Sequence, residues 1–166
     1  MTSYLVLDAY NVIGALDRYR DADDFDAARE LLITDALKAA GWTGRTIVVV
    51  FDAHRAPDPR REEARAGGAV RIVYSAPGES ADDVIERLVK SDGDSYTVCT
   101  ADFALQRAAL ASGAARSAPR EFEELLNELP TLSRTPDVPF RARVSDRLSP
   151  EVLRSLESLR REAEGH

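Results

Sequence analysis

The chain has 166 residues, of which 44% are hydrophobic and 31% charged, and its formal net charge is -7. The length fits one compact domain, and no apolar run is long enough for a membrane span. The acidic balance argues against a broad basic face that grips nucleic acid, although it does not exclude a nuclease, because carboxylates that hold metal are themselves negative. A single cysteine, Cys99, excludes an internal disulfide and a cysteine metal site.

The N-terminal half alternates apolar runs with helical patterns, which is typical of βαβ units and a parallel sheet. The first strand is predicted at residues 4–7 and is followed by a helix over 24–40 that Gly41 and Gly44 end. A continuous β-branched run at 46–51 predicts a strand covered on both faces. The arginine-rich stretch 54–68 is expected to be a loop with a short helix.

The pattern continues with three more strands. They are predicted at 70–74, 96–99 and 114–117, separated by a helix that opens at 80–83 and one over 102–111. A helix over 120–129 stops at Pro130, and residues 131–147 are expected to be irregular. The chain closes with an amphipathic helix over 150–162, where Ser149 is the cap and Pro150 takes the favoured first position.

Four carboxylates fall at equivalent places in this pattern. Asp8 and Asp52 directly follow strands, Asp102 comes just after another, and Asp82 lies in the first turn of a helix. In an open parallel sheet the carboxyl ends of the strands share one edge, and ligands bind in the crevice there. Carboxylates brought together repel one another, so such a cluster favours a bound cation. The sequence therefore predicts a metal site suited to phosphodiester chemistry.

Each acid also has a structural explanation. Asp8 suits an Asx turn that leaves a strand, Asp52 suits a hydrogen bond to the loop after it, and Asp102 suits a helix start. Ser80 and Asp83 fit a capping box, which Asp82 is not needed to complete. Asp82 is therefore a better metal-ligand candidate than its neighbour.

Polar side chains near these acids are candidates for substrate contacts. Gln106 and Arg107 lie one turn beyond Asp102, where they suit contact with a phosphate or base, and a solvated helix face explains them equally well. Arginines suit phosphate recognition, and a basic group beyond the second strand comprises Arg55, Arg60, Arg61 and Arg65. Because Glu62 and Glu63 interrupt that group, a solvated mixed-charge helix is the better explanation of it.

Four motifs in register resemble the YacP-like branch of the NYN domains, within the PIN-like nuclease superfamily. The matching segments are Leu5–Ile13, Val48–Ala53, Gly78–Glu86 and Val98–Gln106, with a further similarity at Leu156–Arg161. The resemblance implies a three-layer α/β/α fold with a mainly parallel sheet of about five strands. It implies a nuclease domain over 1–130 and, over 131–166, an extension whose helix packs on or beside that domain.

The resemblance also implies a metal-dependent endoribonuclease that cleaves messenger RNA, with the ribosome as a partner. Asp8 and Asp82 are then the leading catalytic acids, Asp102 comes next, and Asp52 and Asn11 support them. The four aspartates would hold Mg²⁺ or Mn²⁺, because hard cations prefer oxygen ligands. Without a visible secretory signal, a cytoplasmic protein is expected, with neither a membrane partner nor a nucleotide cofactor.

Other classes of protein remain as alternatives. The chief one is a non-catalytic module of the same fold that binds RNA or the ribosome. A haloacid-dehalogenase-like phosphatase ranks low, because that chemistry wants a second acid two residues after Asp8, where the chain has Tyr10. A receiver-like domain lacks a suitably placed lysine after the last strands. Neither a P-loop nor a dinucleotide-binding glycine motif occurs.

Overall fold

A computed structural model describes residues 2–53 and 62–129. The described residues belong to one compact unit. The predicted irregular segment 131–147 and the amphipathic helix 150–162 lie outside the described residues, and so does most of the basic group around Arg55. The predicted division at residue 130 stays a prediction.

The described part is built on a six-stranded sheet in the order β3-β4-β2-β1-β5-β6. Five strands are parallel: β1 (Tyr4–Asp8), β2 (Thr46–Phe51), β4 (Val70–Tyr74), β5 (Tyr96–Cys99) and β6 (Ala115–Ser117). The edge strand β3 (Glu62–Arg65) runs antiparallel to β4. The carboxyl ends of the five parallel strands therefore share one edge of the sheet.

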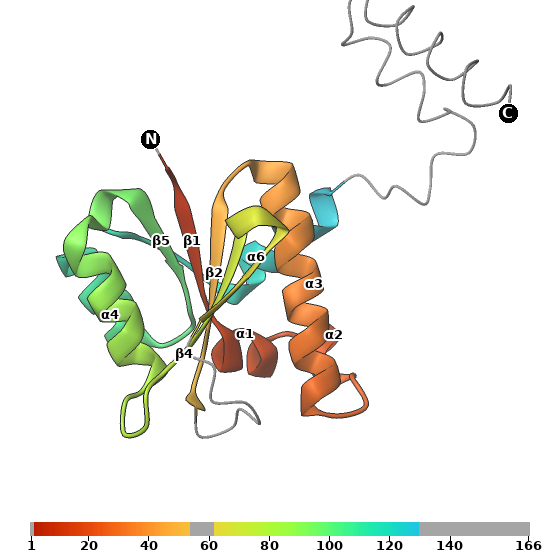
Figure 1. The fold of residues 1–166 in the computed structure, drawn as a ribbon. Coiled ribbons are helices and arrows are strands. Elements are labelled where there is room, and N and C mark those ends of the chain that lie inside the picture. Colours follow the sequence, from red (N-terminus) through yellow and green to blue (C-terminus); the bar gives the residue numbers. More distant parts are fainter. Residues whose placement is uncertain (1, 54–61, 130–166) are drawn as a thin grey trace, which may run out of the picture. The chain divides into compact units, whose positions relative to one another are not determined.

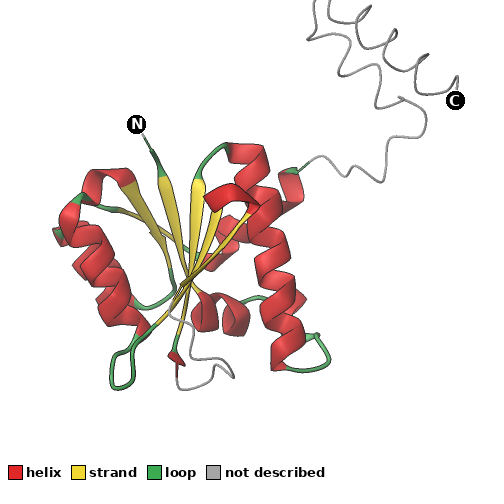
Figure 2. Cartoon of the chain, in the orientation of Figure 1, coloured by secondary structure: helices red, strands yellow, loops and turns green. Residues whose placement is uncertain are grey.

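Helices cover both faces of the sheet, so that α3 and α4 lie on opposite sides of it (Figures 1 and 2). One face carries α1 (Ala9–Ala15), α2 (Asp17–Arg20), α3 (Phe25–Thr43) and α6 (Pro119–Glu128). The other carries α4 (Ala81–Ser91) and α5 (Phe103–Ala111). Two short 3-10 turns, η2 (Ala66–Gly68) and η3 (Gly93–Ser95), precede β4 and β5. The predicted three-layer α/β/α class is confirmed.

Strand residues alternate between two hydrophobic cores, because successive side chains of a strand point to opposite faces. In β1, Leu5 and Leu7 pack with α3, whereas Val6 packs with α4 and α5. All three are almost completely buried. β2 is buried from Ile47 to Phe51, as its β-branched run predicted. Among the described residues, no helix is both long and apolar enough to cross a membrane.

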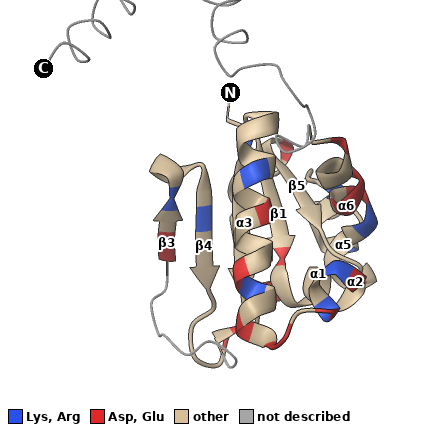
Figure 3. Cartoon of the chain, turned by 90° about the vertical axis from the view of Figure 1, so that its right-hand side faces the viewer, with Lys and Arg blue, Asp and Glu red and all other residues tan. Residues whose placement is uncertain are grey.

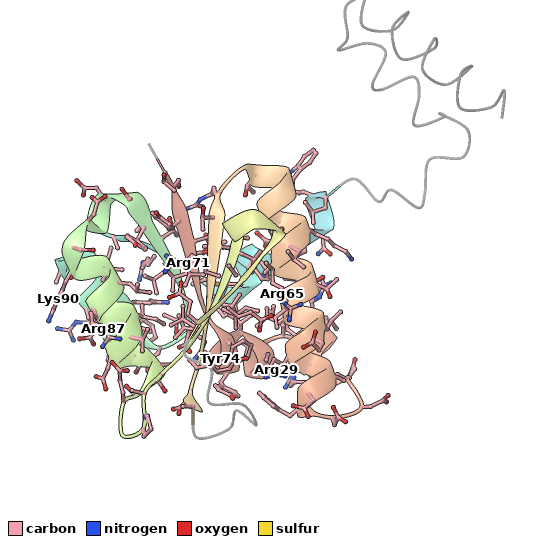
Figure 4. The ribbon with its side chains drawn as sticks, viewed as in Figure 1. Arg29, Arg65, Arg71, Tyr74, Arg87 and Lys90 are labelled. Carbon is pink, nitrogen blue, oxygen red and sulfur yellow. The ribbon has the colours of Figure 1, made fainter. Side chains whose placement is uncertain are left out.

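The expected strand count was wrong by one, because the stretch predicted as a loop with a short helix contains β3. The sequence of β3 is Glu-Glu-Ala-Arg, which lacks the apolar character of a central strand. An edge strand pairs on one side only, so charged residues suit it. Glu62 forms an ion pair with Arg71 of β4, and Glu63 with Arg65. Charges of both signs therefore mark this edge (Figures 3 and 4).

Two details of the helices also differ from expectation. The residues directly after β1 form the short helices α1 and α2, which the sequence did not predict as helical. Gly41 lies inside α3 rather than at its end, and Gly44, with a φ of 70°, is the residue that caps it. A left-handed residue at the end of a helix favours glycine, whereas Gly41 is merely tolerated within the helix.

The order of connections places a switch point between β1 and β5. After β1 the chain crosses to β2 by way of α3 on one face of the sheet. After β5 it moves in the opposite direction, to β6, by way of α5 on the other face. Crevices at such points, beyond the carboxyl ends of the strands, are where open α/β sheets bind ligands. Asp8 ends β1, and the Thr100–Asp102 segment follows β5.

Two Gly→Ala substitutions should have opposite effects on stability. A Cβ at Gly93 would lie 1.7 Å from the backbone oxygen of Ser112, so Gly93→Ala should lower the free energy of unfolding, by about 2 kcal/mol or more. A Cβ at Gly41 would meet nothing within 4 Å, and because alanine favours helix, Gly41→Ala should raise the free energy of unfolding by about 0.5–1 kcal/mol. Urea unfolding of both variants measures this. Equal stabilities of the two variants would contradict the close contact between Gly93 of η3 and the backbone of Ser112.

Candidate active site

Asp8 is the most buried acid of the site. Its residue is 7% exposed, and its carboxylate accepts a hydrogen bond of 3.0 Å from the Thr100 hydroxyl. Burial raises the pKa of Asp8 from the ordinary 3.8 to about 6, the Thr100 bond opposes that rise, and the charges of Asp82 and Asp102 add to it. A carboxylate whose negative charge is disfavoured by its surroundings is suited to a bound cation.

Thr100 links the two strands at the switch point. Its side chain is completely buried, and its Oγ1 both donates to Asp8 and accepts a hydrogen bond of 3.1 Å from the amide of Asp102. Its own amide donates to the carbonyl of Ser117, and this hydrogen bond continues the β5–β6 pairing. A single hydroxyl therefore sets the position of Asp8 relative to the backbone that carries Asp102.

Asn11 also contacts the turn between β5 and α5. It lies in α1, and its Oδ1 accepts a hydrogen bond of 2.6 Å from the amide of Ala101. The predicted supporting residue is thus one turn from Asp8 in sequence and in contact with the segment between β5 and α5. The contact fixes α1 against that segment.

Asp82 and Asp83 differ in role although they are neighbours. Asp83 completes the capping box of α4 with Ser80, as expected, and these bonds lower the pKa of Asp83. Asp82 is half-buried, and its pKa is raised by desolvation and then by the charges of other acids, namely Asp102, Glu86, Asp83 and Asp52. Asp82 therefore belongs electrostatically to a group of acids at the carboxyl edge of the sheet. We call this group, which comprises Asp8, Asp52, Asp82 and Asp102, the carboxyl-edge cluster.

The two other predicted acids lie at the same edge. Asp102 is the N-cap of α5, where its Oδ1 accepts from the amide of Leu105 at 3.1 Å. Asp52 directly follows β2, and its charge contributes to the raised pKa of Asp82. Within residues 2–53 and 62–129, however, no three carboxylate, imidazole or thiol side chains stand close enough to enclose one ion. The acids are thus coupled by charge without forming a preassembled ligand cage.

The predicted substrate contacts separate into three cases. Gln106 is buried, and its amide donates to the carbonyl of Thr100 at 2.6 Å, so its side chain supports the β5–α5 turn. Arg107 is exposed on α5 and forms no ion pair with any residue of the described part. Arg55 lies outside the described residues.

Two residues that contribute to the site were not singled out from the sequence. Thr100 looks like an ordinary residue after a strand, and only the pairing of β1 with β5 brings it to Asp8. Glu86 lies four residues after Asp82 in α4, a spacing that places both on one face of a helix. That spacing was a usable signal. Cys99 is buried, which raises its pKa to about 12, and it is an inert core residue as expected.

The fold and the cluster define an open α/β domain whose coupled carboxylates lie at the carboxyl edge of a parallel sheet. Residues 5–161 match the YacP-like NYN domain family, and the chain belongs to that family. Membership points to nuclease chemistry and to RNA as the substrate class.

Individual relatives agree with this assignment. The chain is 33% identical to the Bacillus subtilis protein YacP over 168 residues, which cover 95% of this chain and 96% of the relative. It is also similar to the crystal structure of Rae1 (YacP) from Bacillus subtilis, with a TM-score of 0.66, 26% identity, and coverage of 96% and 95% of the two chains. The crystal structure of a mutant form of the same Rae1 matches with a TM-score of 0.64 and 30% identity over 77% of each chain.

Substitution of Thr100 should shift the titration of Asp8. Thr100→Val keeps the shape of the side chain and removes the hydroxyl that lowers the pKa of Asp8, so that pKa should rise above about 6. Thr100→Ser keeps the hydroxyl and should leave the pKa of Asp8 nearly unchanged. Carboxyl ¹³C NMR titration of all three proteins gives the values. An identical Asp8 titration in the valine variant would show that the hydrogen bond is unimportant.

Asp8→Asn should stabilise the protein in a pH-dependent way. The folded pKa of Asp8 lies above its ordinary value of 3.8, so the folded chain binds a proton at Asp8 more tightly than the unfolded chain does. Protonation of Asp8 therefore stabilises the fold at low pH, and this stabilisation is lost as the pH rises through about 6. Asparagine avoids the loss, so its variant should be more stable than wild type by roughly 2–3 kcal/mol at pH 8 and equally stable near pH 4. Urea unfolding at both pH values measures the difference.

Asp83→Asn is the matched control for that experiment. It changes the charge in the same way, but the pKa of Asp83 is lowered by its capping bonds. The asparagine variant should therefore gain no stability at pH 8. A gain of similar size in both variants would mean that general charge reduction, rather than the burial of Asp8, is responsible.

Proposed function

We propose that this protein is a metal-dependent endoribonuclease whose active site is the carboxyl-edge cluster. The observation that carries the proposal is the buried carboxylate of Asp8 at the β1–β5 switch point, coupled to the charges of Asp82 and Asp102. Acids are kept close together at the expense of stability where function requires them. The family supplies the expectation of nuclease chemistry.

The residues present fit a hard divalent cation. Asp8 and Asp82 both have raised pKa values, so a positive charge beside them would relieve the repulsion between their ionised forms. Mg²⁺ commonly takes one or two carboxylates and completes its shell with water and substrate phosphate, which agrees with the lack of an enclosed three-residue group in the described part. Asp8, Asp82, Asp102 and Asp52 would supply one or two carboxylates to each of one or two Mg²⁺ or Mn²⁺ ions.

When bound, such an ion would supply an acidified water and offset the charge that develops on the phosphate. The chain's own residues would hold the acids in place. Thr100 keeps the Asp8 carboxylate in position and Asn11 fixes the turn that carries Asp102. Arg107, and Arg55 from outside the described residues, would contact the RNA, while Gln106 would act by supporting the turn. Hydrolysis would leave a 5′-phosphate and a 3′-hydroxyl.

The substrate we propose is messenger RNA, met in the cytoplasm and on the translating ribosome. The net charge of -7 makes affinity for free RNA weak, so a larger assembly that presents the RNA would supply the missing binding energy. The alternative is a non-catalytic module that binds RNA or the ribosome through the same surface. Cleavage activity separates the two functions.

Cleavage should depend on Asp8 and Asp82 and on added metal. The wild-type protein should cut single-stranded RNA in Mn²⁺ or Mg²⁺, and EDTA should stop it. Asp8→Asn and Asp82→Asn should each lower the rate at least about 100-fold, with unchanged circular dichroism, because they remove a ligand charge and keep the shape. Denaturing gels of labelled RNA, free and on translating ribosomes, measure the products.

Asp83→Asn is again the matched control, because the side chain next to Asp82 undergoes the same change of charge but belongs to the helix cap. That variant should cleave at the wild-type rate. Full activity of Asp8→Asn and Asp82→Asn under saturating RNA would refute the assignment of the site. No cleavage by the wild type, on free RNA or on ribosomes, would favour the binding module.

A further inference from the structure

One aromatic side chain at the carboxyl edge is exposed to solvent. Phe103 is 75% exposed, whereas Phe51 and Phe122 are buried in the core. The other large hydrophobic side chains that are exposed in the described part are Trp42 and Leu110. Trp42 lies near the C-terminal end of α3, just before β2 begins. This is the edge of the sheet opposite to the one that carries the acids. Phe103 is therefore the exposed aromatic ring on the side of the acids.

The first turn of α5, which carries this ring, is fixed by hydrogen bonds. Asp102 caps the helix through the amide of Leu105, and Gln106 bonds back to the carbonyl of Thr100. Leu105 and Gln106 are buried, and Phe103 is the first residue of the helix on its exposed side. Because Cα–Cβ bonds tilt toward the N-terminus of a helix, the Phe103 side chain extends toward the edge that carries Asp8 and Asp102.

The charges around the ring explain what it could bind. Without a bound cation the acids of the site repel phosphate, and the chain as a whole is acidic. A nucleotide held there needs a contact that does not depend on phosphate charge, and a nucleobase stacked on an aromatic ring provides one. Arg107 follows Phe103 by four residues on the same exposed helix face and is not engaged in an ion pair within the described part. It can contact a neighbouring phosphate.

We propose that Phe103 is a stacking platform for one nucleobase beside the scissile phosphate of single-stranded RNA, with Arg107 on an adjacent phosphate. This inference rests on the proposed function and adds the class of substrate, which is unpaired RNA. The bases of a duplex are stacked on one another and are not available to the ring, so unpaired RNA is the form selected. Stacking tolerates any base, and Phe103 therefore contributes affinity and position rather than sequence preference.

The test is RNA binding in an Asp8→Asn background, which prevents cleavage. Fluorescence anisotropy with a labelled single-stranded RNA should show Kd raised about 5- to 100-fold by Phe103→Ala and little changed by Phe103→Trp. An abasic residue moved along the RNA should weaken binding at one position by a similar factor. At that position Phe103→Ala should add no further loss, because the base that stacked on the ring is gone.

Leu110→Ala is the matched control. Leu110 is 50% exposed on the same helix, seven residues further along, and its truncation should leave Kd unchanged. Equal effects of the two alanine substitutions, or none from Phe103→Ala, would overturn the inference. So would a lower melting temperature or a changed oligomeric state of Phe103→Ala with unaltered RNA affinity, because the ring would then pack against protein.

The outcomes also separate this inference from the proposed function. If the wild-type protein cleaves RNA, and Phe103→Ala with Asp8 intact binds and cleaves RNA like wild type, the stacking role is wrong and the proposed nuclease function stands. If binding depends on Phe103 but no metal supports cleavage, the ring has its role and the catalytic proposal fails. Failure of the wild-type protein to bind single-stranded RNA at low salt would overturn the stacking role directly.

Discussion

The burial of the Asp8 carboxylate is the constraint on which the rest of the site depends. The end of a strand that lies between two other strands is poorly accessible to water, and Asp8 is only 7% exposed there. Ionisation is disfavoured by desolvation and by the nearby acids, and within the fold it is favoured chiefly by one hydroxyl, that of Thr100. The fold thus keeps a negative group in a place that a cation would make favourable.

The connections of the sheet create this situation. β1 is central and pairs with both β2 and β5, so its end is enclosed on either side. The direction of the chain reverses between β1 and β5, the arrangement at which open α/β sheets leave a crevice beyond the strand ends. Hydrogen bonds from Thr100 and to Asn11 join the turns on the two sides of that switch point. The site is therefore supported by the Thr100 side chain and by the backbone amide of Ala101 in the β5–α5 turn.

Much of the fold could be predicted because its signals are local. The run Thr46–Phe51 is apolar from its second residue to its end, and the bounds of β2 agreed with it. β3 was missed because Glu62–Arg65 is a strand only by virtue of pairing with β4, and α1 because its residues follow Asp8 without a capping pattern. For the site, the strand-end acids were visible, whereas the bridging role of Thr100 depends on a contact between residues 92 apart in sequence.

The charged edge formed by β3 also has a consequence for the behaviour of the protein in solution. The strands behind it are strongly hydrophobic, and an open β-edge beside them could template the addition of a strand from another molecule. Such an addition would have to strip water from the Glu62–Arg71 and Glu63–Arg65 pairs. The charged side chains of β3 thus oppose polymerisation through this edge of the sheet.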